Sequence, residues 1–159
     1  MLEEQRLDTG LHDCAAFDCG VPVLNEYLRK SATQHRRRGV SQTYVLVDDG
    51  APKQVLGYYT LSAAQLEAEA LSDAERKRLP RYPIPCIRMG RLAVDRAGRG
   101  RGYGRLLVGP AVHRCLRARQ EVAAYALVVD AKDESAVNFY LHYGFRACRD
   151  APETLYLPL

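Results

Sequence analysis

Apolar residues along the chain alternate between helical and strand spacing, and these changes outline its elements. Pro22 favours the first turn of a helix, and the apolar residues that follow at helical spacing predict a helix through the basic residues 35–38 up to Gly39. Residues 42–50 ("QTYVLVDDG") are typical of a strand that ends in a turn, and residues 54–66 ("QVLGYYTLSAAQL") are typical of its partner, with the turn formers Asp49, Gly50 and Pro52 at the junction. These two segments predict an antiparallel hairpin.

The second half of the chain continues the alternation of helices and strands. Ser72 and Glu75 form an S-x-x-E capping box, which predicts a short helix before the proline-rich residues 80–85. Further along, the pattern predicts a strand in "CIRMGRLAVD", a helix in "GRLLVGPAVHRCLRARQ", a buried strand in "AAYALVVDA", a helix in "DESAVNFYLHYGF" and a last strand in "ETLYLPL". Gly144 is placed to end the last helix, and Pro110 predicts a kink in the preceding one. We expect an α/β fold with a mixed sheet, formed by one domain over residues 1–159.

Composition and charge limit the class of protein. At 159 residues, with 47% hydrophobic and 26% charged residues, the chain is typical of one soluble domain. The acidic N-terminal segment and the lack of a long apolar run predict a cytoplasmic protein without a membrane partner. Five scattered cysteines indicate reduced thiols, and His12, Cys14 and Cys19 lack the second ligand pair of a zinc site. We therefore expect no metal.

The segment "RLAVDRAGRGRGYGRLLV" carries the clearest chemical pattern. Glycines at 98, 100, 102 and 104 alternate with other residues between a strand and a helix. This spacing fits neither the dinucleotide fingerprint G-x-G-x-x-G nor a P-loop. A glycine-rich turn at a helix N-terminus can direct successive backbone N–H groups at one anion, and a pyrophosphate would satisfy them.

In this context the sequence resembles the GNAT superfamily of acetyltransferases. The acetyl-CoA motif of that family, [Q/R]-x-x-G-x-[G/A], is matched by Arg99, Gly102 and Gly104, and the later pattern A-x-x-x-Y-x-x-x-G-F begins at Ala136. The resemblance implies a GNAT fold, with a mostly antiparallel mixed sheet, a splayed central strand pair and flanking helices. It also implies acetyl-CoA as the co-substrate.

The resemblance implies roles for particular residues. The backbone of the strand before the loop would bind the pantetheine arm, at Leu92, Ala93 and Val94. The loop would hold the pyrophosphate, through Arg99, Gly100, Arg101, Gly102, Tyr103, Gly104 and Arg105. Tyr140 falls on the tyrosine of the helical motif and would protonate the departing thiolate as the catalytic acid. Asp133 stands where many members have asparagine.

Acetyl transfer needs a neutral amine, and the sequence shows no evident general base. His113, His142, Glu134 and Asp133 are candidates only by their place in the chain. A lysine amine with a pKa of about 10.4 is neutral in roughly one molecule in a thousand near pH 7.4, at a cost of about 4 kcal/mol. An α-amine with a pKa of about 7.7 to 8.0 costs under about 1 kcal/mol. An α-amine is therefore the acceptor that depends least on a general base of the enzyme.

The finer resemblance is to GNAT toxins of bacterial toxin–antitoxin modules, carried by "FDCGVPVLNEYLRKSATQHRRRG", "YYTLS", "RYPIPCIRMGRLAVD" and "VDAKDESAVNFYLHYGF". Members of this group acetylate the α-amine of aminoacyl-tRNA and thereby block translation. The resemblance implies aminoacyl-tRNA and a ribbon-helix-helix antitoxin as partners, and a homodimer. Two basic runs would contact the tRNA, through Arg36, Arg37, Arg38, Arg76, Arg78 and Arg81.

Other interpretations share parts of this pattern. Each basic run by itself is typical of a solvated face, and a helical tyrosine is often packed in a core. A GNAT enzyme that acts on a small-molecule amine or a protein N-terminus would have the same loop and the same tyrosine. A third alternative is a degenerate acetyltransferase that binds nucleic acid or a repressor without turnover. The intact glycine loop and Tyr140 are evidence against this alternative.

Overall fold

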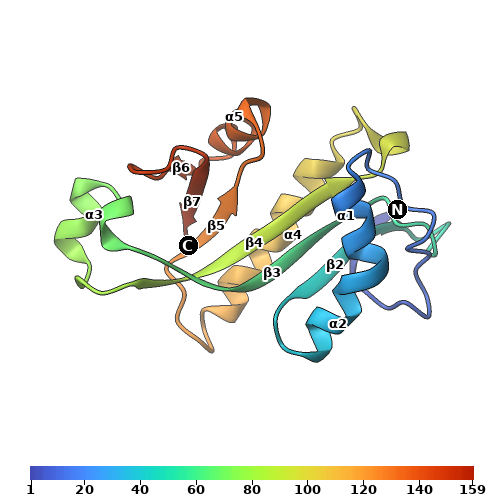
Figure 1. Cartoon of the computed structure of the whole chain (residues 1–159), viewed down its shortest axis with the longest axis horizontal. Coiled ribbons are helices and arrows are strands. Elements are labelled where there is room, and N and C mark those ends of the chain that lie inside the picture. The colour runs from blue at the N-terminus through green and yellow to red at the C-terminus, as the bar shows by residue number, and fades with distance from the viewer. The chain divides into compact units, whose positions relative to one another are not determined.

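The computed structural model describes all 159 residues, which form strands and helices in alternation (Figure 1). The strands are β1 (Leu2–Arg6), β2 (Gln42–Asp48), β3 (Gly57–Leu66), β4 (Ile84–Val94), β5 (Ala126–Asp130), β6 (Arg146–Ala147) and β7 (Thr154–Pro158). The α-helices are α1 (Pro22–Glu26), α2 (Ala32–Arg37), α3 (Asp73–Arg78), α4 (Tyr103–Ala118) and α5 (Glu134–His142), with a π-helical turn η1 (Tyr27–Ser31) and 3₁₀ turns η2 (Ala68–Ala70) and η3 (Arg96–Gly98).

The strands form one mixed sheet in the order β1-β2-β3-β4-β5-β7-β6. The pairs β1/β2, β2/β3, β5/β7 and β6/β7 are antiparallel, and β4/β5 is parallel. The predicted fold class, a mixed and mostly antiparallel sheet with flanking helices, is therefore confirmed. No helix is long and apolar enough to cross a membrane.

The chain divides into two compact units, which are described separately. Unit 1 comprises residues 1–62 and 90–111, and unit 2 comprises residues 63–89 and 112–159. The single domain expected over residues 1–159 stays a prediction.

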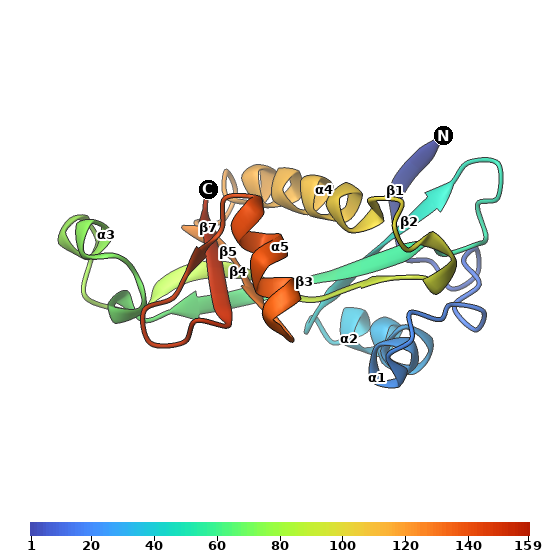
Figure 2. The same cartoon turned by 90° about the horizontal axis from the view of Figure 1, so that it is seen from above.

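In unit 1, helices cover both faces of the strands. Figure 2 shows α1 and α2 on one face and the start of α4 on the other. The core on the first face gathers residues that are at most 7% exposed from the helices and strands, among them Tyr27, Leu28, Val45, Tyr58 and Ala93. On the other face, a Cβ at Gly57 would lie 2.9 Å from the Leu107 side chain, so this glycine permits close packing of α4 on β3.

The predicted first helix is confirmed, with one local change. It begins with Pro22 in its first turn, and Gly39 follows its end with a φ of +72°, a conformation that favours glycine. Between α1 and α2 the chain makes the π-helical turn η1, which the apolar spacing did not predict. Turns of this kind concentrate at functional positions in helices.

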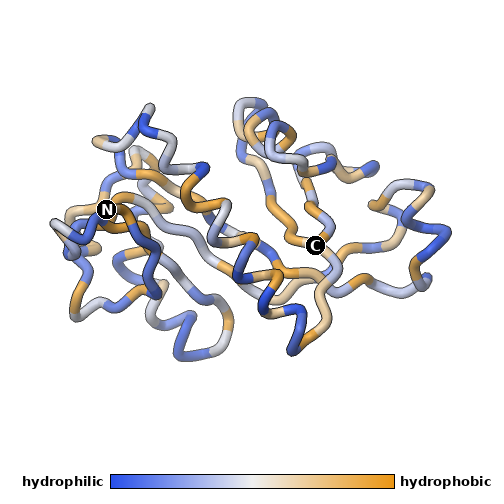
Figure 3. The backbone as a smooth tube through the Cα atoms, turned by 180° about the vertical axis from the view of Figure 1, so that it is seen from behind, coloured by the Kyte–Doolittle hydropathy of each residue, from blue (hydrophilic) through white to orange (hydrophobic).

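In unit 2, β5 is fully buried from Ala126 to Val129, which confirms the strand predicted to be covered on both faces. Its core also includes Leu71, Ile84, Cys86 and Tyr156. Helix α3 differs from the rest of the unit, because Glu75 is its one buried residue. In the hydropathy colouring of Figure 3, the basic residues of α3 are blue, whereas β5 and β7 are orange.

Two strands were missed by the pattern analysis, and both have physical reasons. β1, "LEEQR", is mostly polar, and it becomes a strand because Leu2–Arg6 pairs with Asp48–Tyr44 of β2 at the edge of the sheet. β6 has only two residues, which pair with Tyr156 and Leu155 of β7. Neither strand carries an alternating apolar pattern of its own. The helix predicted to contain Pro110 runs through it as α4, and its kink stays a prediction.

Candidate active site

The glycine segment forms a tight turn between β4 and α4. Asp95 opens the 3₁₀ turn η3 and accepts a hydrogen bond from the Ala97 N–H at 2.9 Å. Gly100 and Gly102 have φ values of +80° and +75°, and nothing lies within 4 Å of a Cβ added at either position. Glycine is therefore required here by backbone conformation, and the space beside the turn is open.

The backbone donors of this turn divide into two sets. The N–H groups of Gly98 and Arg101 donate to carbonyls of the turn itself, and the Leu106 N–H donates to the Gly102 carbonyl. The N–H groups of Gly100, Gly102, Tyr103, Gly104 and Arg105 donate to no carbonyl outside the helix. The last three belong to the first turn of α4, where an α-helix has no acceptor for them. The turn thus has unpaired donors and the positive end of a 16-residue helix.

The side chains of the loop serve different purposes. Arg99, Arg101 and Arg105 are exposed, and Arg99 donates from Nη2 to the Cys19 carbonyl at 2.8 Å. Tyr103 is only 9% exposed, and its ring lies against Gly98, where an added Cβ would come within 2.5 Å of it. Tyr103 packs its ring against the turn and can offer a ligand its backbone N–H, whereas the arginines can offer charge.

The end of β4 leaves backbone groups without a strand partner. Pairing with β5 ends at Met89 and Val129, although β4 continues to Val94. The predicted pantetheine contacts Leu92, Ala93 and Val94 lie in this last part of β4, and Ala93 packs into the unit 1 core. An extended ligand can hydrogen-bond such an edge in the manner of an added strand.

In unit 2, Tyr140 lies on α5 and is 6% exposed. Its ring packs against Phe139 and Phe145, with ring centroids 5.2 Å away in each case. Burial raises the pKa of Tyr140 to about 12, so the phenol is protonated throughout the neutral range. Its chemical state is that of a proton donor rather than a base.

The other candidate acid–base residues have different roles or positions. Asp133 is the N-cap of α5, where its carboxylate accepts from the Ala136 N–H at 2.8 Å, so capping explains an acid at this position. His113, His142 and Glu134 are exposed.

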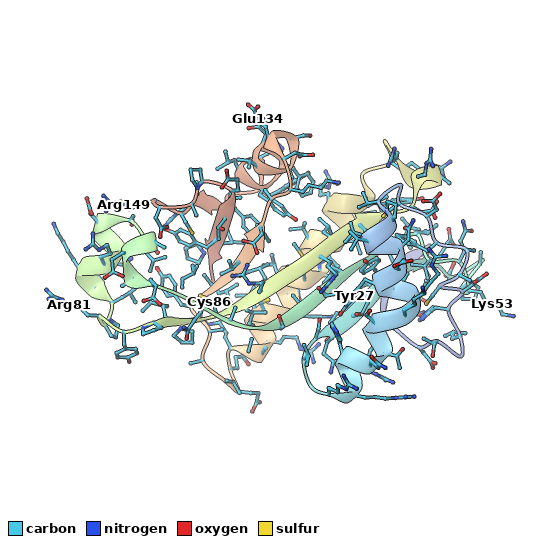
Figure 4. All side chains as sticks on the ribbon, viewed as in Figure 1. Tyr27, Lys53, Arg81, Cys86, Glu134 and Arg149 are labelled. Atoms are coloured by element: carbon cyan, nitrogen blue, oxygen red, sulfur yellow. The ribbon has the colours of Figure 1, made fainter.

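The two basic runs lie in different units. Arg36, Arg37 and Arg38 are exposed at the end of α2 in unit 1. Arg76, Arg78 and Arg81 are exposed on and after α3 in unit 2, where Figure 4 labels Arg81. Arg76 is 3.6 Å from Asp73, which also pairs with Arg149. Arg78 and Arg81 have no such partner, so they are the better candidates on this run for an external anion.

No cluster of side chains in the chain is suited to hold a metal ion. Of the three residues considered for zinc, His12 is buried, accepts at Nδ1 from the Asp8 N–H at 3.0 Å and bonds through Nε2 to Gln5 at 2.9 Å. Burial lowers the pKa of His12. It is a neutral core histidine with both ring nitrogens occupied.

One residue of functional interest was missed by the sequence analysis. Arg91 of β4 lies with its guanidinium carbon 3.5 Å from the ring centroid of Tyr27 in η1. No sequence motif marks this pair, because its members are far apart in the chain and only the packing of η1 on β4 joins them.

Comparison with known proteins agrees with this geometry. The model of the acetyltransferase (GNAT) domain matches residues 39–147, which include β4, the glycine turn and α5. The chain belongs to the GNAT acetyltransferase family. The chain is 34% identical over 145 residues to a tRNA-acetylating toxin of Mycobacterium tuberculosis, covering 91% of this chain and 85% of that one.

Solved structures of GNAT toxins are similar over nearly the whole chain. AtaT complexed with acetyl-methionyl-tRNAfMet superposes with a TM-score of 0.92 at 33% identity, covering 99% of this chain and 95% of that one. AtaTR bound with acetyl-CoA superposes with a TM-score of 0.82 at 34% identity, covering 99% and 93%. A tyrosine-to-phenylalanine mutant of KacT superposes with a TM-score of 0.91 at 30% identity, covering 99% and 94%.

Proposed function

We propose that this chain transfers the acetyl group of acetyl-CoA to the α-amine of aminoacyl-tRNA and thereby acts as a toxin that blocks translation. The observation that carries the proposal is the row of unpaired N–H groups at the start of α4, in a chain of the GNAT family. Similarity to a tRNA-acetylating toxin, and to AtaT in complex with acetyl-methionyl-tRNAfMet, supports the acceptor.

The residues present fit acetyl-CoA. The N–H groups of Gly100 and of residues 102–105 supply donors for its pyrophosphate, and Arg101 and Arg105 supply exposed positive charge beside them. The unpaired edge of β4 at Leu92–Val94 supplies backbone groups for its extended arm. Acetyl-CoA would supply the activated acetyl thioester, and the chain would hold and orient it.

Tyr140 would hold the proton that the leaving thiolate needs. Its buried phenol keeps that proton up to high pH, since its pKa is about 12. A thiol has a pKa of about 8.5, so transfer from Tyr140 becomes favourable only where binding lowers the tyrosine pKa or where the proton moves together with cleavage of the C–S bond. AtaT and KacT have each been solved with a tyrosine replaced by phenylalanine, a change that removes only a hydroxyl.

The acceptor follows from charge and from amine chemistry. The exposed arginines of the two runs provide contacts for phosphates, and such contacts release counterions and weaken as salt rises. About half or more of the α-amine of an aminoacyl ester is neutral near pH 8, so it needs no strong general base. A charged tRNA combines the two: its phosphates can bind the exposed arginines, and its aminoacyl end carries an α-amine that is easily deprotonated.

We further infer a ribbon-helix-helix antitoxin as the protein partner and a homodimer as the assembly. AtaT has been solved with the C-terminus of its antitoxin AtaR, and KacTA has been solved with DNA, which supports a partner of this kind. Size-exclusion chromatography with light scattering, on the chain alone and with its co-encoded partner, tests both points.

The proposed acceptor is tested by offering several amines in parallel. With labelled acetyl-CoA, we expect transfer to total charged tRNA and none to deacylated tRNA. Free amino acids and lysine peptides should react far more slowly. If these small amines react as fast as charged tRNA, the chain is a GNAT enzyme for small amines.

A further inference from the structure

Arg91 and Tyr27 form a cation–π stack in unit 1, and its surroundings fix its position. The Arg91 guanidinium carbon lies over the Tyr27 ring, 3.5 Å from its centroid, which is within the range of a cation–π interaction. Tyr27, labelled in Figure 4, is 5% exposed and also stacks on Tyr58, with ring centroids 6.4 Å apart. Its hydroxyl shares a hydrogen bond with His35 Nδ1 at 3.0 Å. The ring is therefore a rigid support.

The cation on this support is not neutralised. No carboxylate forms an ion pair with Arg91, whereas Arg88 on the same strand pairs with Asp130. Arg91 is partly exposed, and its guanidinium carbon lies over the ring of Tyr27. A ligand would approach the guanidinium from the side opposite this ring. A second planar group can stack there, in the way that RNA bases stack on arginine planes.

The location of the stack selects its ligand. Arg91 directly precedes Leu92–Val94, the proposed contacts of the acetyl-CoA arm. His35, which holds the Tyr27 hydroxyl, directly precedes Arg36–Arg38, the proposed phosphate contacts. Through these contacts the stack connects the strand of the proposed acetyl-donor contacts with the helix that carries the proposed tRNA contacts.

We propose that Arg91, supported by Tyr27, is the platform for the base of the 3′-terminal nucleotide of the charged tRNA. That nucleotide carries the aminoacyl ester, so stacking its base beside β4 would place the α-amine near the acetyl group. The proposal rests on the proposed function, because it assigns a binding residue for the acceptor named there. Its chemistry is stacking on a flat cation, which differs from a simple charge contact.

The test compares three variants. Arg91→Lys keeps the charge and loses the plane, Arg91→Met loses both, and Arg88→Lys is the control on the same strand. We expect both Arg91 variants to raise the KM for total charged tRNA about tenfold, because one stacked base contributes that much or more. Arg88→Lys should keep the wild-type KM. The Kd for acetyl-CoA and the melting temperature should be unchanged in all three.

Two further measurements distinguish failure of the Arg91 platform from failure of the proposed function. They are the salt dependence of the KM for charged tRNA and acetyl transfer by the wild-type enzyme. With Arg91→Lys, the slope of log KM against log salt should match the wild type, because the number of charges is the same. A wild-type KM in Arg91→Lys would show that only charge matters and would overturn the platform. An equal rise in the Arg88→Lys control would overturn it too. No transfer to charged tRNA by the wild-type enzyme would overturn the proposed function itself, and the platform with it.

Discussion

At the scale of single residues, the chain keeps its proposed acid protonated by burying it. Tyr140 lies among aromatic rings in unit 2, and this burial raises its pKa to about 12. The motif around Tyr140 could be predicted from the sequence, because Ala136, Tyr140 and Gly144 are local in the chain. The shift in pKa could not, because it depends on residues that pack around the phenol only after folding.

Replacing Tyr140 with phenylalanine removes the proton donor and little else. We expect Tyr140→Phe to keep its Kd for acetyl-CoA and its melting temperature, and to lose about a hundredfold or more of kcat. Calorimetry and steady-state assays with charged tRNA measure the two effects. Tyr143→Phe, a change on the same helix end, is the matched control. Turnover close to wild type in Tyr140→Phe would assign this tyrosine to packing and the proton to solvent.

The pKa of Tyr140 also predicts a pH profile. An acid acts while it is protonated, so its contribution is lost only as pH rises through its pKa, here about 12. We expect kcat/KM to rise as the substrate amine deprotonates, near its pKa of about 7.7 to 8.0, and then to stay level up to about pH 10. A fall between pH 8 and 9.5 that is absent from Tyr140→Phe would contradict a pKa this high.

At the scale of elements, the turn before α4 presents backbone N–H donors to the solvent, whereas the helix α3 is anchored by a buried carboxylate. The turn exposes N–H groups because Gly100 and Gly102 adopt positive φ values. Helix α3 is held by a buried carboxylate, since Glu75 accepts from Tyr125, Tyr156 and Arg146 and from the Ser72 hydroxyl at 2.9 Å. The sequence predicted the Ser72–Glu75 cap. It could not predict the tyrosine and arginine partners, which come from distant parts of the chain.

A side chain at Gly102 should disrupt the anion site. Gly102→Val imposes a strained positive φ and fills the open space beside the turn, so we expect acetyl-CoA affinity to fall at least about tenfold. Gly39→Val is the matched control, because Gly39 has a φ of +72° and the same open surroundings but lies after α2. Calorimetry should show normal acetyl-CoA binding in the control. Equal loss in both variants would mean that strain, and not the site, is responsible.

Removing the Glu75 carboxylate should destabilise unit 2. Burial favours a raised pKa for Glu75, but hydrogen bonds from Tyr125, Tyr156 and Ser72, together with the charge of Arg146, hold the pKa below its ordinary value. Glu75→Ala leaves these hydroxyls unpaired, and we expect a loss of about 2 kcal/mol in urea unfolding at pH 7. Because the folded pKa is lowered, this difference should shrink as pH falls below about 4.5. A difference that is constant down to pH 3 would contradict the ionised carboxylate.

At the scale of the whole molecule, the sequence predicted the order of elements and the family more fully than the edges of the sheet. The strands and helices with clear periodicity, from the hairpin of β2 and β3 to α5, are where the pattern placed them. β1 and β6 were missed because pairing, not composition, makes them strands. The Arg91–Tyr27 stack was missed for a related reason, since it depends on the contact of η1 with β4.

Neutralising the basic run at the end of α2 should separate tRNA binding from acetyl-CoA binding. We expect the triple change of Arg36, Arg37 and Arg38 to glutamine to raise the KM for charged tRNA and to reduce its salt dependence, because up to three phosphate contacts are lost. The Kd for acetyl-CoA should be unchanged. If the triple variant matches the wild type at every salt concentration, this run is a solvated face.

The central claim is that the acetylated group is the α-amine at the end of a charged tRNA, and the identity of the product tests it most directly. Charged tRNA is incubated with the protein and acetyl-CoA, digested with a nuclease and analysed by mass spectrometry. Our account predicts N-acetyl-aminoacyl adenosine as the product, formed by the wild type and lost with Tyr140→Phe. Acetyl groups found on a nucleobase, on free amino acids or on no part of the tRNA would contradict it.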